Sequence, residues 1–171
     1  MRRIALVCTV MAIGVLLGGG LAIAKEIQGD AENNRLVGTE RRDFIYGFGG
    51  NDTINGKGED DELYGSQGRD SVSGNDGVDE AYGGSANDTV RGGDGDDEVY
   101  GGSGTDNLSG GKGSDYLSGG GNSDTIVSAD GRANDTVSCG TGADDQVLAD
   151  KGDVVLQGDL VLGDCDRVTY Q

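Results

Sequence analysis

The apolar residues of this chain recur every nine positions between residues 38 and 127. In each nonapeptide the first position is glycine, the sixth is aspartate and the eighth is apolar. The eighth positions are Ile45, Ile54, Leu63, Val72, Ala81, Val90, Val99, Leu108, Leu117 and Ile126. A low-complexity sequence rich in glycine and aspartate would not keep an apolar residue in phase with two other columns. The register therefore predicts ten copies of one structural unit, stacked so that neighbours bury a shared core.

A longer period of 18 residues is superimposed on the period of nine. Alternate units carry tyrosine at the ninth position, as Tyr46, Tyr64, Tyr82 and Tyr100. The seventh position also alternates, between Phe44, Glu62, Glu80, Glu98 and Tyr116 in one set and Thr53, Ser71, Thr89, Asn107 and Thr125 in the other. Two nonapeptides therefore form one coil, and the three residues around each apolar position form a short strand with its middle side chain inward. We expect an all-β fold in which two parallel sheets enclose a narrow core.

The N-terminal residues have the features of a secretory signal peptide. A basic start precedes an apolar, glycine-rich stretch, and an Ala-Ile-Ala cleavage site ends at Ala24. We predict a signal peptide over residues 1–24. An uncleaved membrane anchor is the alternative, because the apolar stretch is almost long enough to span a bilayer. Residues 25–37 are expected to form an N-terminal capping repeat, in which Asn34 replaces the aspartate.

The strict register is lost after Val127, and we expect residues 128–171 to form a C-terminal cap over the last coil. Two cysteines of the predicted mature chain, Cys139 and Cys165, lie in this segment. An even number of cysteines in a secreted chain favours a disulfide between them. Two free thiols are the alternative, which an extracellular location disfavours.

The composition narrows the function classes. Acidic residues outnumber basic ones 31 to 13, so the net charge is −18, and it becomes −20 once Arg2 and Arg3 leave with the signal peptide. This balance argues against nucleic acid or anionic lipid as partners, and we expect no stable membrane insertion after signal cleavage. The chain has no histidine and no evident nucleophile–base pair, so we do not expect an enzyme.

The turns have the chemistry of a divalent cation site. The sixth-position aspartates would form two columns of closely spaced like charges, Asp43, Asp61, Asp79, Asp97, Asp115 and Asp52, Asp70, Asp88, Asp106, Asp124. Ca²⁺ takes six to eight oxygens from carboxylates and backbone carbonyls, and neighbouring coils could share that shell. Glycine permits the positive φ that turns carbonyls towards an ion. Mg²⁺ fits less well because it demands a rigid octahedron, and ordinary Gly-Asp turns would not keep ten aspartates in phase.

Three nonapeptides, 92–100, 101–109 and 110–118, keep the full pattern Gly-Gly-x-Gly-x-Asp-x-apolar-x. With this pattern the sequence resembles the RTX (repeats-in-toxin, haemolysin-type) calcium-binding family, and in particular its small secreted bacterial members, including actinobacterial ones. The resemblance covers residues 38–127 closely and residues 29–37 loosely. It implies a right-handed parallel β-roll that binds several Ca²⁺ ions between the turns of successive coils.

The resemblance also implies which residues hold the ions. The best sites would join the turns 74–79, 92–97 and 110–115 on one side, and 83–88, 101–106 and 119–124 on the other. The implied aspartate ligands are Asp52, Asp61, Asp70, Asp79, Asp88, Asp97, Asp106, Asp115 and Asp124. The implied glycines are Gly74, Gly77, Gly83, Gly92, Gly93, Gly95, Gly101, Gly102, Gly104, Gly110, Gly111, Gly113 and Gly119. Arg41 and Glu59 replace the fourth-position glycine, which makes their turns weaker candidates.

These patterns predict a secreted calcium-binding repeat protein whose folding is driven by Ca²⁺. The alternative is an extracellular adhesion module, associated with the cell surface, that binds a polysaccharide or another surface partner. Such a module would use an outer sheet face, on which rows of tyrosine and glutamate are expected.

Overall fold

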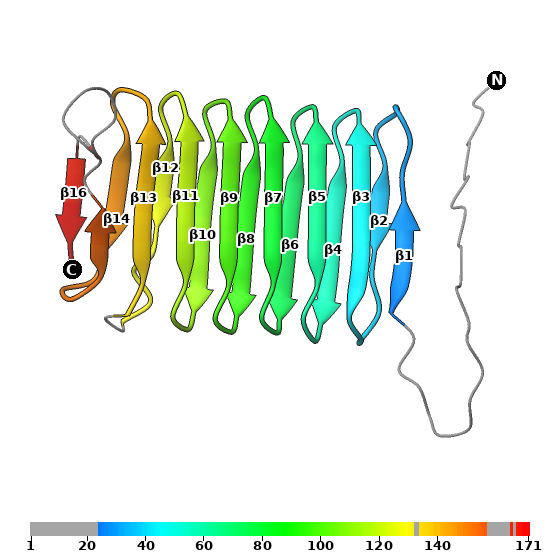
Figure 1. Cartoon of the computed structure of the whole chain (residues 1–171), viewed down its shortest axis with the longest axis horizontal. Coiled ribbons are helices and arrows are strands. Elements are labelled where there is room, and N and C mark those ends of the chain that lie inside the picture. Colours follow the sequence, from blue (N-terminus) through cyan, green and yellow to red (C-terminus); the bar gives the residue numbers. More distant parts are fainter. Residues whose placement is uncertain (1–23, 132–133, 157–164, 166) are drawn as a thin grey trace.

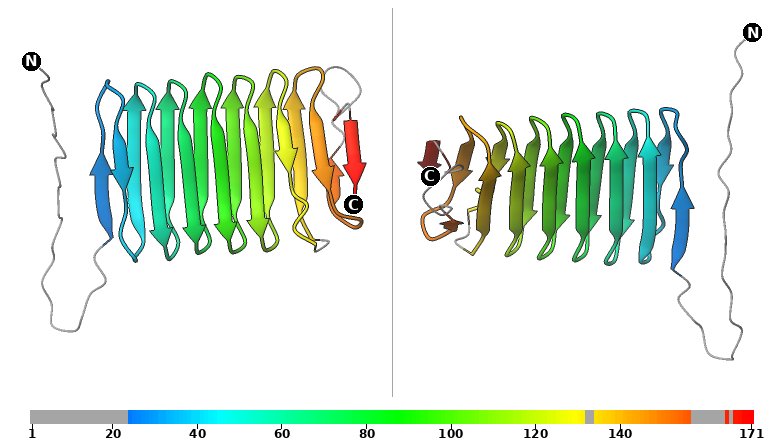
Figure 2. Two further views of the ribbon diagram at one scale, coloured as in Figure 1. Left: turned by 180° about the vertical axis from the view of Figure 1, so that it is seen from behind. Right: turned by 45° about the horizontal axis from the view of Figure 1, so that its top comes forward.

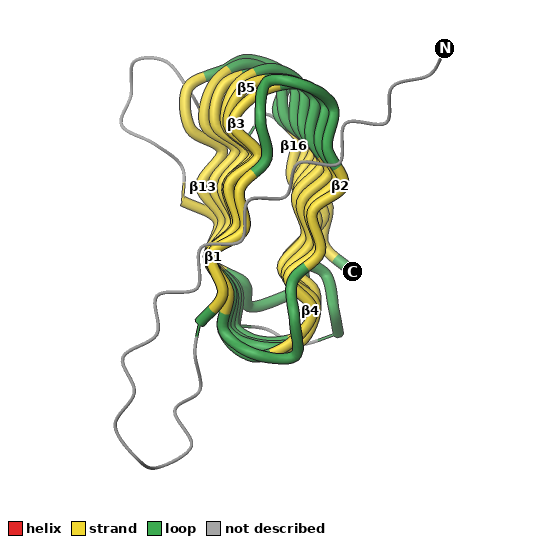
Figure 3. Tube along the Cα trace, turned by 90° about the vertical axis from the view of Figure 1, so that its right-hand side faces the viewer, coloured by secondary structure: helices red, strands yellow, loops and turns green. Residues whose placement is uncertain are grey.

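The computed structural model describes residues 24–131, 134–156, 165 and 167–171, and these residues form a two-sheet solenoid without helices (Figure 1). The chain enters the two sheets alternately, so odd-numbered strands make one sheet and even-numbered strands the other. Both sheets are parallel throughout, and partners in the regular part are 18 residues apart, as the sequence predicted. Seen along the solenoid axis, the sheets face each other and the turns close both ends of the cross-section (Figure 3).

Most strands are longer than the three residues expected from the sequence, and only β2, β12 and β15 have that length. The odd sheet contains β1 (Lys25–Gln28), β3 (Asp43–Gly49), β5 (Glu62–Gln67), β7 (Glu80–Ser85), β9 (Glu98–Ser103), β11 (Tyr116–Gly121), β13 (Thr136–Thr141) and β15 (Val154–Leu156). The even sheet contains β2 (Arg35–Val37), β4 (Thr53–Gly58), β6 (Ser71–Asp76), β8 (Thr89–Asp94), β10 (Asn107–Lys112), β12 (Thr125–Val127), β14 (Gln146–Ala149) and β16 (Arg167–Tyr170). Pairing continues into the next nonapeptide, where Gly84 of β7 faces Gly102 of β9, because glycines let neighbouring coils approach closely. Only the fourth to sixth positions remain as turn.

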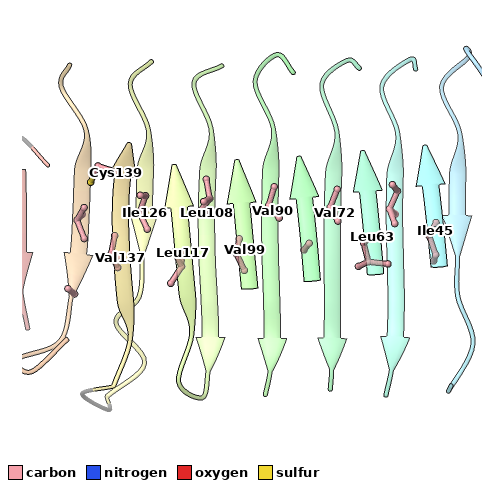
Figure 4. Packing of buried hydrophobic residues seen from close by; sticks show 14 of the residues in the cluster. Ile45, Leu63, Val72, Val90, Val99, Leu108, Leu117, Ile126, Val137 and Cys139 are labelled. Carbon is pink, nitrogen blue, oxygen red and sulfur yellow. The ribbon is translucent and has the colours of Figure 1, made fainter. Parts of the chain in front are cut away.

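The core is a single layer of side chains between the sheets (Figure 4). The ten eighth-position residues are each at most 2% exposed. In β7, for example, Ala81 is buried while Glu80 and Tyr82 on either side are not, which confirms the out-in-out alternation. Fully burying one Val or Leu side chain contributes about 1.5–3 kcal/mol. A core one side chain deep is therefore thin for a chain in which so many acidic side chains repel one another.

The slip in register after Val127 does not end the solenoid (Figure 2). Thr136 pairs with Tyr116 and Gln146 pairs with Thr125, at offsets of 20 and 21 residues instead of 18. The additional residues lie outside the strands, so β13 and β14 still join their sheets in parallel, and β15 and β16 extend them further. The segment predicted as a C-terminal cap thus adds strands to both sheets.

A disulfide joins Cys139 in β13 to Cys165, which lies just before β16. The two Cα atoms are 5.4 Å apart and both cysteines are buried. The bond confirms the pairing expected from the sequence. At the other end of the chain, residues 1–23 of the predicted signal peptide lie outside the described residues. Where the structure is described, it holds no helix long and apolar enough to cross a membrane.

Candidate calcium sites in the turns

The sixth-position aspartates line the turns in two columns, one at each long edge of the solenoid. We call the turns that lead into odd strands the first edge, and those that lead into even strands the second edge. The first edge, at the bottom of Figure 1, contains Asp43, Asp61, Asp79, Asp97 and Asp115. The second edge contains Asp52, Asp70, Asp88, Asp106 and Asp124. All ten side chains are buried.

One carboxylate oxygen of each column aspartate is held by the backbone of the preceding coil. The N–H of Asp79 donates to Oδ1 of Asp97 at 2.8 Å on the first edge. The same bond recurs along both edges in the pairs Asp43–Asp61, Asp52–Asp70, Asp61–Asp79, Asp70–Asp88, Asp88–Asp106, Asp97–Asp115 and Asp106–Asp124. These bonds fix the orientation of every carboxylate and leave its second oxygen for another partner.

The second oxygen, Oδ2, is buried without a hydrogen-bond partner in nine consecutive repeats, at Asp52, Asp61, Asp70, Asp79, Asp88, Asp97, Asp106, Asp115 and Asp124. An ionised carboxylate can only accept hydrogen bonds, so no rearrangement of its own protons satisfies it. Leaving one buried polar atom unsatisfied costs about 1–3 kcal/mol, and more for a charged group. A row of such oxygens is costly while the carboxylates are charged, and a cation or a proton would relieve that cost.

The first-position glycines leave room for these oxygens. A Cβ on Gly101 would lie 2.6 Å from Oδ2 of Asp106 and 2.6 Å from the carbonyl oxygen of Gly119 in the next coil. A carboxylate oxygen and a carbonyl oxygen of the next coil converge in this way at seven first-position glycines, namely Gly38, Gly47, Gly56, Gly65, Gly83, Gly101 and Gly119. Positive φ was the expected reason for the glycines, and this expectation is wrong for the first position, where no glycine of the ten repeats has a positive φ.

Positive φ occurs instead at the second and fourth positions. Gly93 and Gly95 have φ values of 142° and 146°. Any Cβ at these two glycines would overlap the carbonyl oxygens of Asn75 and Gly77 in the preceding coil, so these carbonyls point into the gap between coils. Three fourth-position residues that are not glycine still adopt positive φ, namely Glu59, Ala86 and Asn122. The Glu59 turn, which the sequence made a weaker candidate, therefore keeps the common backbone conformation.

The first column is closed at both of its described ends. Oδ2 of Asp43 accepts hydrogen bonds from the N–H and hydroxyl of Thr39, and its Oδ1 accepts from the N–H of Lys25 at 3.3 Å. At the other end the same backbone bonds continue the column from Asp115 to Asp135 and, at 3.3 Å, from Asp135 to Asp153. Oδ2 of Asp153 accepts from the Ser128 hydroxyl at 3.0 Å and the Asp150 N–H at 2.7 Å. The unpartnered oxygens of the first edge are thus confined to the interior of the column. Both carboxylate oxygens of Asp43, whose turn carries Arg41, therefore have hydrogen-bond partners within the protein.

Two members of the first column, Asp135 and Asp153, were not predicted from the sequence, and Asp135 is the one with an unpartnered oxygen. Its Oδ1 accepts from the N–H of Asp115 at 2.8 Å, and its Oδ2 is buried with no partner. The available signal was the triplet from Asp135 to Val137, which repeats the Asp-x-apolar pattern eleven residues after Asp124 instead of nine. The two additional residues place Asp135 outside the nine-residue register of the preceding units.

Burial disfavours the charged form of the column aspartates when no metal is bound. It raises the pKa of Asp97 to about 7, against the opposing effect of the Asp79 N–H, and the charges of Asp79 and Asp115 add to the rise. Burial likewise raises the pKa of Asp88 to about 7 and that of Asp79 to about 6. A dication between the carboxylates would supply the missing stabilisation of the charged form.

The donor set suits Ca²⁺ better than other metals. Among the described residues, no three Asp, Glu, Cys or His side chains converge on one point, so a bound metal must also take backbone oxygens. The Oδ2 atoms and the carbonyls of the first, second and fourth positions are the oxygen atoms that two adjacent coils could offer to an ion. Ca²⁺ accepts such mixed, flexible oxygen shells, whereas transition metals favour nitrogen and sulfur ligands.

A comparison with protein families agrees with this geometry. The RTX calcium-binding nonapeptide repeat matches in four overlapping copies, over residues 28–63, 56–90, 73–108 and 100–133. The chain belongs to this family, as the sequence predicted, and its β-roll is a structural calcium-binding fold that is generally non-enzymatic. A search of curated proteins found no match, and a search of solved structures found none either.

Proposed function

We propose that this chain is a secreted calcium-binding repeat protein whose folding is driven by Ca²⁺ bound between successive turns. The observation that carries the proposal is the row of buried Oδ2 atoms without partners, repeated in nine consecutive nonapeptides. The ligands would be the nine aspartates from Asp52 to Asp124, together with the turn glycines named from the sequence. Several ions would bind, each shared by neighbouring coils of one edge.

Folding and metal binding are expected to be one process. The metal-free chain has a core one side chain deep and two stacks of buried carboxylates, so the free energy of binding has to supply much of the free energy of folding. Because adjacent coils of one edge share each ion, the transition should be cooperative along each edge. Affinity per site should be on the order of 10⁻⁴–10⁻³ M, as in other extracellular calcium modules.

Circular dichroism during a calcium titration tests the proposal. We expect little β-structure in calcium-free buffer and a cooperative gain at millimolar Ca²⁺, with Mg²⁺ at the same concentration as the control. Equilibrium dialysis should show several ions bound per chain. A chain with the same β-content in calcium-free and calcium-containing buffer, and with no bound Ca²⁺, would overturn the proposal.

Secretion is part of the proposal and has its own support. The A-x-A site ends at Ala24, and β1 begins at the next residue, Lys25, so cleavage there would remove no strand. RTX calcium-binding repeats are typical of secreted proteins, and millimolar Ca²⁺ is available outside cells. Mass spectrometry of protein from the culture medium should find Lys25 at the N-terminus. A retained N-terminal segment would instead support the membrane-anchor alternative.

The adhesion alternative has one structural feature to argue from, the predicted tyrosine row of the odd sheet. Tyr46, Tyr64, Tyr82 and Tyr100 form a stack with ring centroids 4.9, 4.9 and 4.7 Å apart and planes within 4° of parallel. Each inner ring is covered on both faces by its neighbours, so these faces are not available to stack on a sugar. The row therefore supports cohesion between coils more than recognition of a polysaccharide.

A further inference from the structure

On both edges a fifth-position side chain accepts a hydrogen bond from the backbone N–H of the fifth-position residue in the next coil. The two edges differ in the charge of the accepting side chain. On the first edge, Oδ1 of Asp60 accepts from the N–H of Val78 at 3.0 Å. Oδ1 of Asp96 accepts from the N–H of Ser114 at 2.8 Å in the same way. Both acceptors are exposed carboxylates, and each reaches across to the coil that follows.

On the second edge the acceptor is a neutral amide. Oδ1 of Asn51 accepts from the N–H of Arg69 at 2.9 Å, and Oδ1 of Asn87 accepts from the N–H of Thr105 at 3.1 Å. The geometry of the turn is therefore preserved, and the charge is the variable. Arg69 adds a positive charge to this edge. At the same position the first edge has Asp60, Val78, Asp96 and Ser114, and also Arg42, whose charge is paired with Glu62 at 2.9 Å.

These fifth-position groups lie next to the buried column oxygens. The N–H bound by Asp60 belongs to the residue that precedes Asp79, and the N–H bound by Asp96 belongs to the residue that precedes Asp115. Oδ2 of Asp79 and of Asp115 are both buried without partners. Another exposed acid of this edge, Asp94, is paired with Lys112 at 2.7 Å and adds little net charge. Asp60 and Asp96 are thus fixed carboxylates beside the candidate metal ligands.

We propose that Asp60 and Asp96 make the first edge the tighter of two calcium columns, so that Ca²⁺ fills it before the second. The inference rests on the proposed calcium binding and adds an order of filling to it. A fixed carboxylate close to a divalent ion, partly screened at physiological ionic strength, strengthens binding by about two- to threefold. The neutral Asn51 and Asn87 give no such gain, and Arg69 weakens binding nearby. The edges should therefore differ by a few-fold in the Ca²⁺ concentration that half-saturates them.

Two matched double variants test the inference. The first combines Asp60→Asn and Asp96→Asn on the first edge, and the second combines Asn51→Asp and Asn87→Asp on the second edge. Each keeps the oxygen that accepts the hydrogen bond and changes only the charge. Calcium titrations of the purified protein are followed through the amide NMR signals of Gly113 on the first edge and Gly104 on the second. These glycines precede Ser114 and Thr105, whose N–H groups make the bonds in question.

In the wild type we expect the Gly113 signal to reach its midpoint at a Ca²⁺ concentration a few-fold below that of Gly104. The first variant should raise the Gly113 midpoint about two- to threefold, and the second should lower the Gly104 midpoint by a similar factor. In 1 M salt, where the Debye length is about 3 Å, the two midpoints should converge. Coincident midpoints in the wild type, or equal shifts of both signals in either variant, would overturn the inference. If neither signal responds to Ca²⁺, the proposed function itself fails.

Discussion

The N–H of Asp79 holds Oδ1 of Asp97 at 2.8 Å and leaves Oδ2 of Asp97 buried with no partner. The two oxygens of one carboxylate therefore have separate tasks. Oδ1 aligns adjacent coils through the backbone, and under the proposed function Oδ2 would bind a metal ion. The same division is repeated along both edges, so stacking of coils and the proposed binding of ions would depend on the same side chains.

Replacing Asp97 by asparagine should separate these tasks. Asparagine can keep the Oδ1 acceptor, but its NH₂ group cannot coordinate a cation. We expect Asp97→Asn to lower the number of bound Ca²⁺ ions and to destabilise the calcium-bound protein by about 1–3 kcal/mol. Calorimetric titration and thermal unfolding in excess Ca²⁺ measure both effects.

The matched control is Asp43→Asn, because Oδ2 of Asp43 is already satisfied by Thr39. It should leave the number of bound ions unchanged, even if it costs stability. Equal ion counts for Asp97→Asn and the wild type would show that Asp97 is not a ligand.

Adding a methyl group at a first-position glycine should displace a carboxylate. In Gly101→Ala the new Cβ would lie 2.6 Å from Oδ2 of Asp106 and from the carbonyl oxygen of Gly119. We expect weaker calcium binding and a loss of about 1–3 kcal/mol, as for other overpacked sites. Gly121→Ala is the control, since its Cβ would find its nearest neighbour at 3.7 Å and Gly121 has no positive φ. If both variants bind Ca²⁺ as the wild type does, the space above the first-position glycines has no role in calcium binding.

Protonation of the column aspartates at low pH should partly replace Ca²⁺ in stabilising the folded state. The folded-state pKa of Asp97 and Asp88 is raised to about 7 by burial, above the ordinary value of 3.8. A carboxyl with a raised pKa favours the fold when protonated, so its contribution is fully present below about pH 4 and is lost as the pH rises through about 7. Calcium-free protein should therefore gain β-structure between pH 7.5 and pH 4.5, followed by circular dichroism. In excess Ca²⁺ the trend should reverse, because protons compete for the ligands. No gain of structure on acidification would contradict the assigned burial of the columns.

Much of the fold could be read from the sequence because three columns stay in phase over ten units. The alternation of Tyr64 and Tyr82 with non-aromatic residues at the ninth position predicts the coil of 18 residues. The stack of these rings at 4.9 Å confirms it. The residue pattern within one nonapeptide and the stacking of successive coils predict the same fold, because each repeat contacts mainly its neighbours in a repeat protein.

The parts that could not be predicted depend on contacts between coils. Gly84 and Gly102 were expected to lie in turns, and they pair across the sheet instead because their lack of side chains allows close approach. Thr39 gave no sequence signal that it would close the end of a column. Asp135 was missed because its unit contains inserted residues, and pairing with β11 restores its position in space.

Breaking the disulfide should loosen one end of the solenoid. The double variant Cys139→Ser with Cys165→Ser opens a loop with a sequence separation of 26 residues. The chain-entropy model assigns such a loop about 3–4 kcal/mol. Because repeat stability comes mostly from neighbouring units, hydrogen exchange should increase in β13 to β16 and remain nearly unchanged in β5 to β10. Uniformly faster exchange along the chain would indicate that the bond stabilises the solenoid as a whole.

The tyrosine row provides a test that separates cohesion from recognition. Tyr82 lies between Tyr64 and Tyr100, with ring centroids 4.9 and 4.7 Å away, and burial together with the charge of Glu80 raises its pKa to about 12. Threonine keeps the strand propensity of the position but removes both ring contacts. If the row is cohesive, Tyr82→Thr should lower the stability of the calcium-bound protein by about 1–2 kcal/mol, since aromatic pairs contribute about 0.5–1.5 kcal/mol each.

The same variant should leave retention on cell-wall and polysaccharide material unchanged. Thr89→Ser, on the outer face of the even sheet, is the control for an exposed substitution outside the row. Unchanged stability combined with lost retention would reverse the interpretation and make the tyrosines a binding face. The two readouts move in opposite ways under the two hypotheses, because a stacked ring whose faces are covered contributes to cohesion and has little surface left with which to hold a sugar.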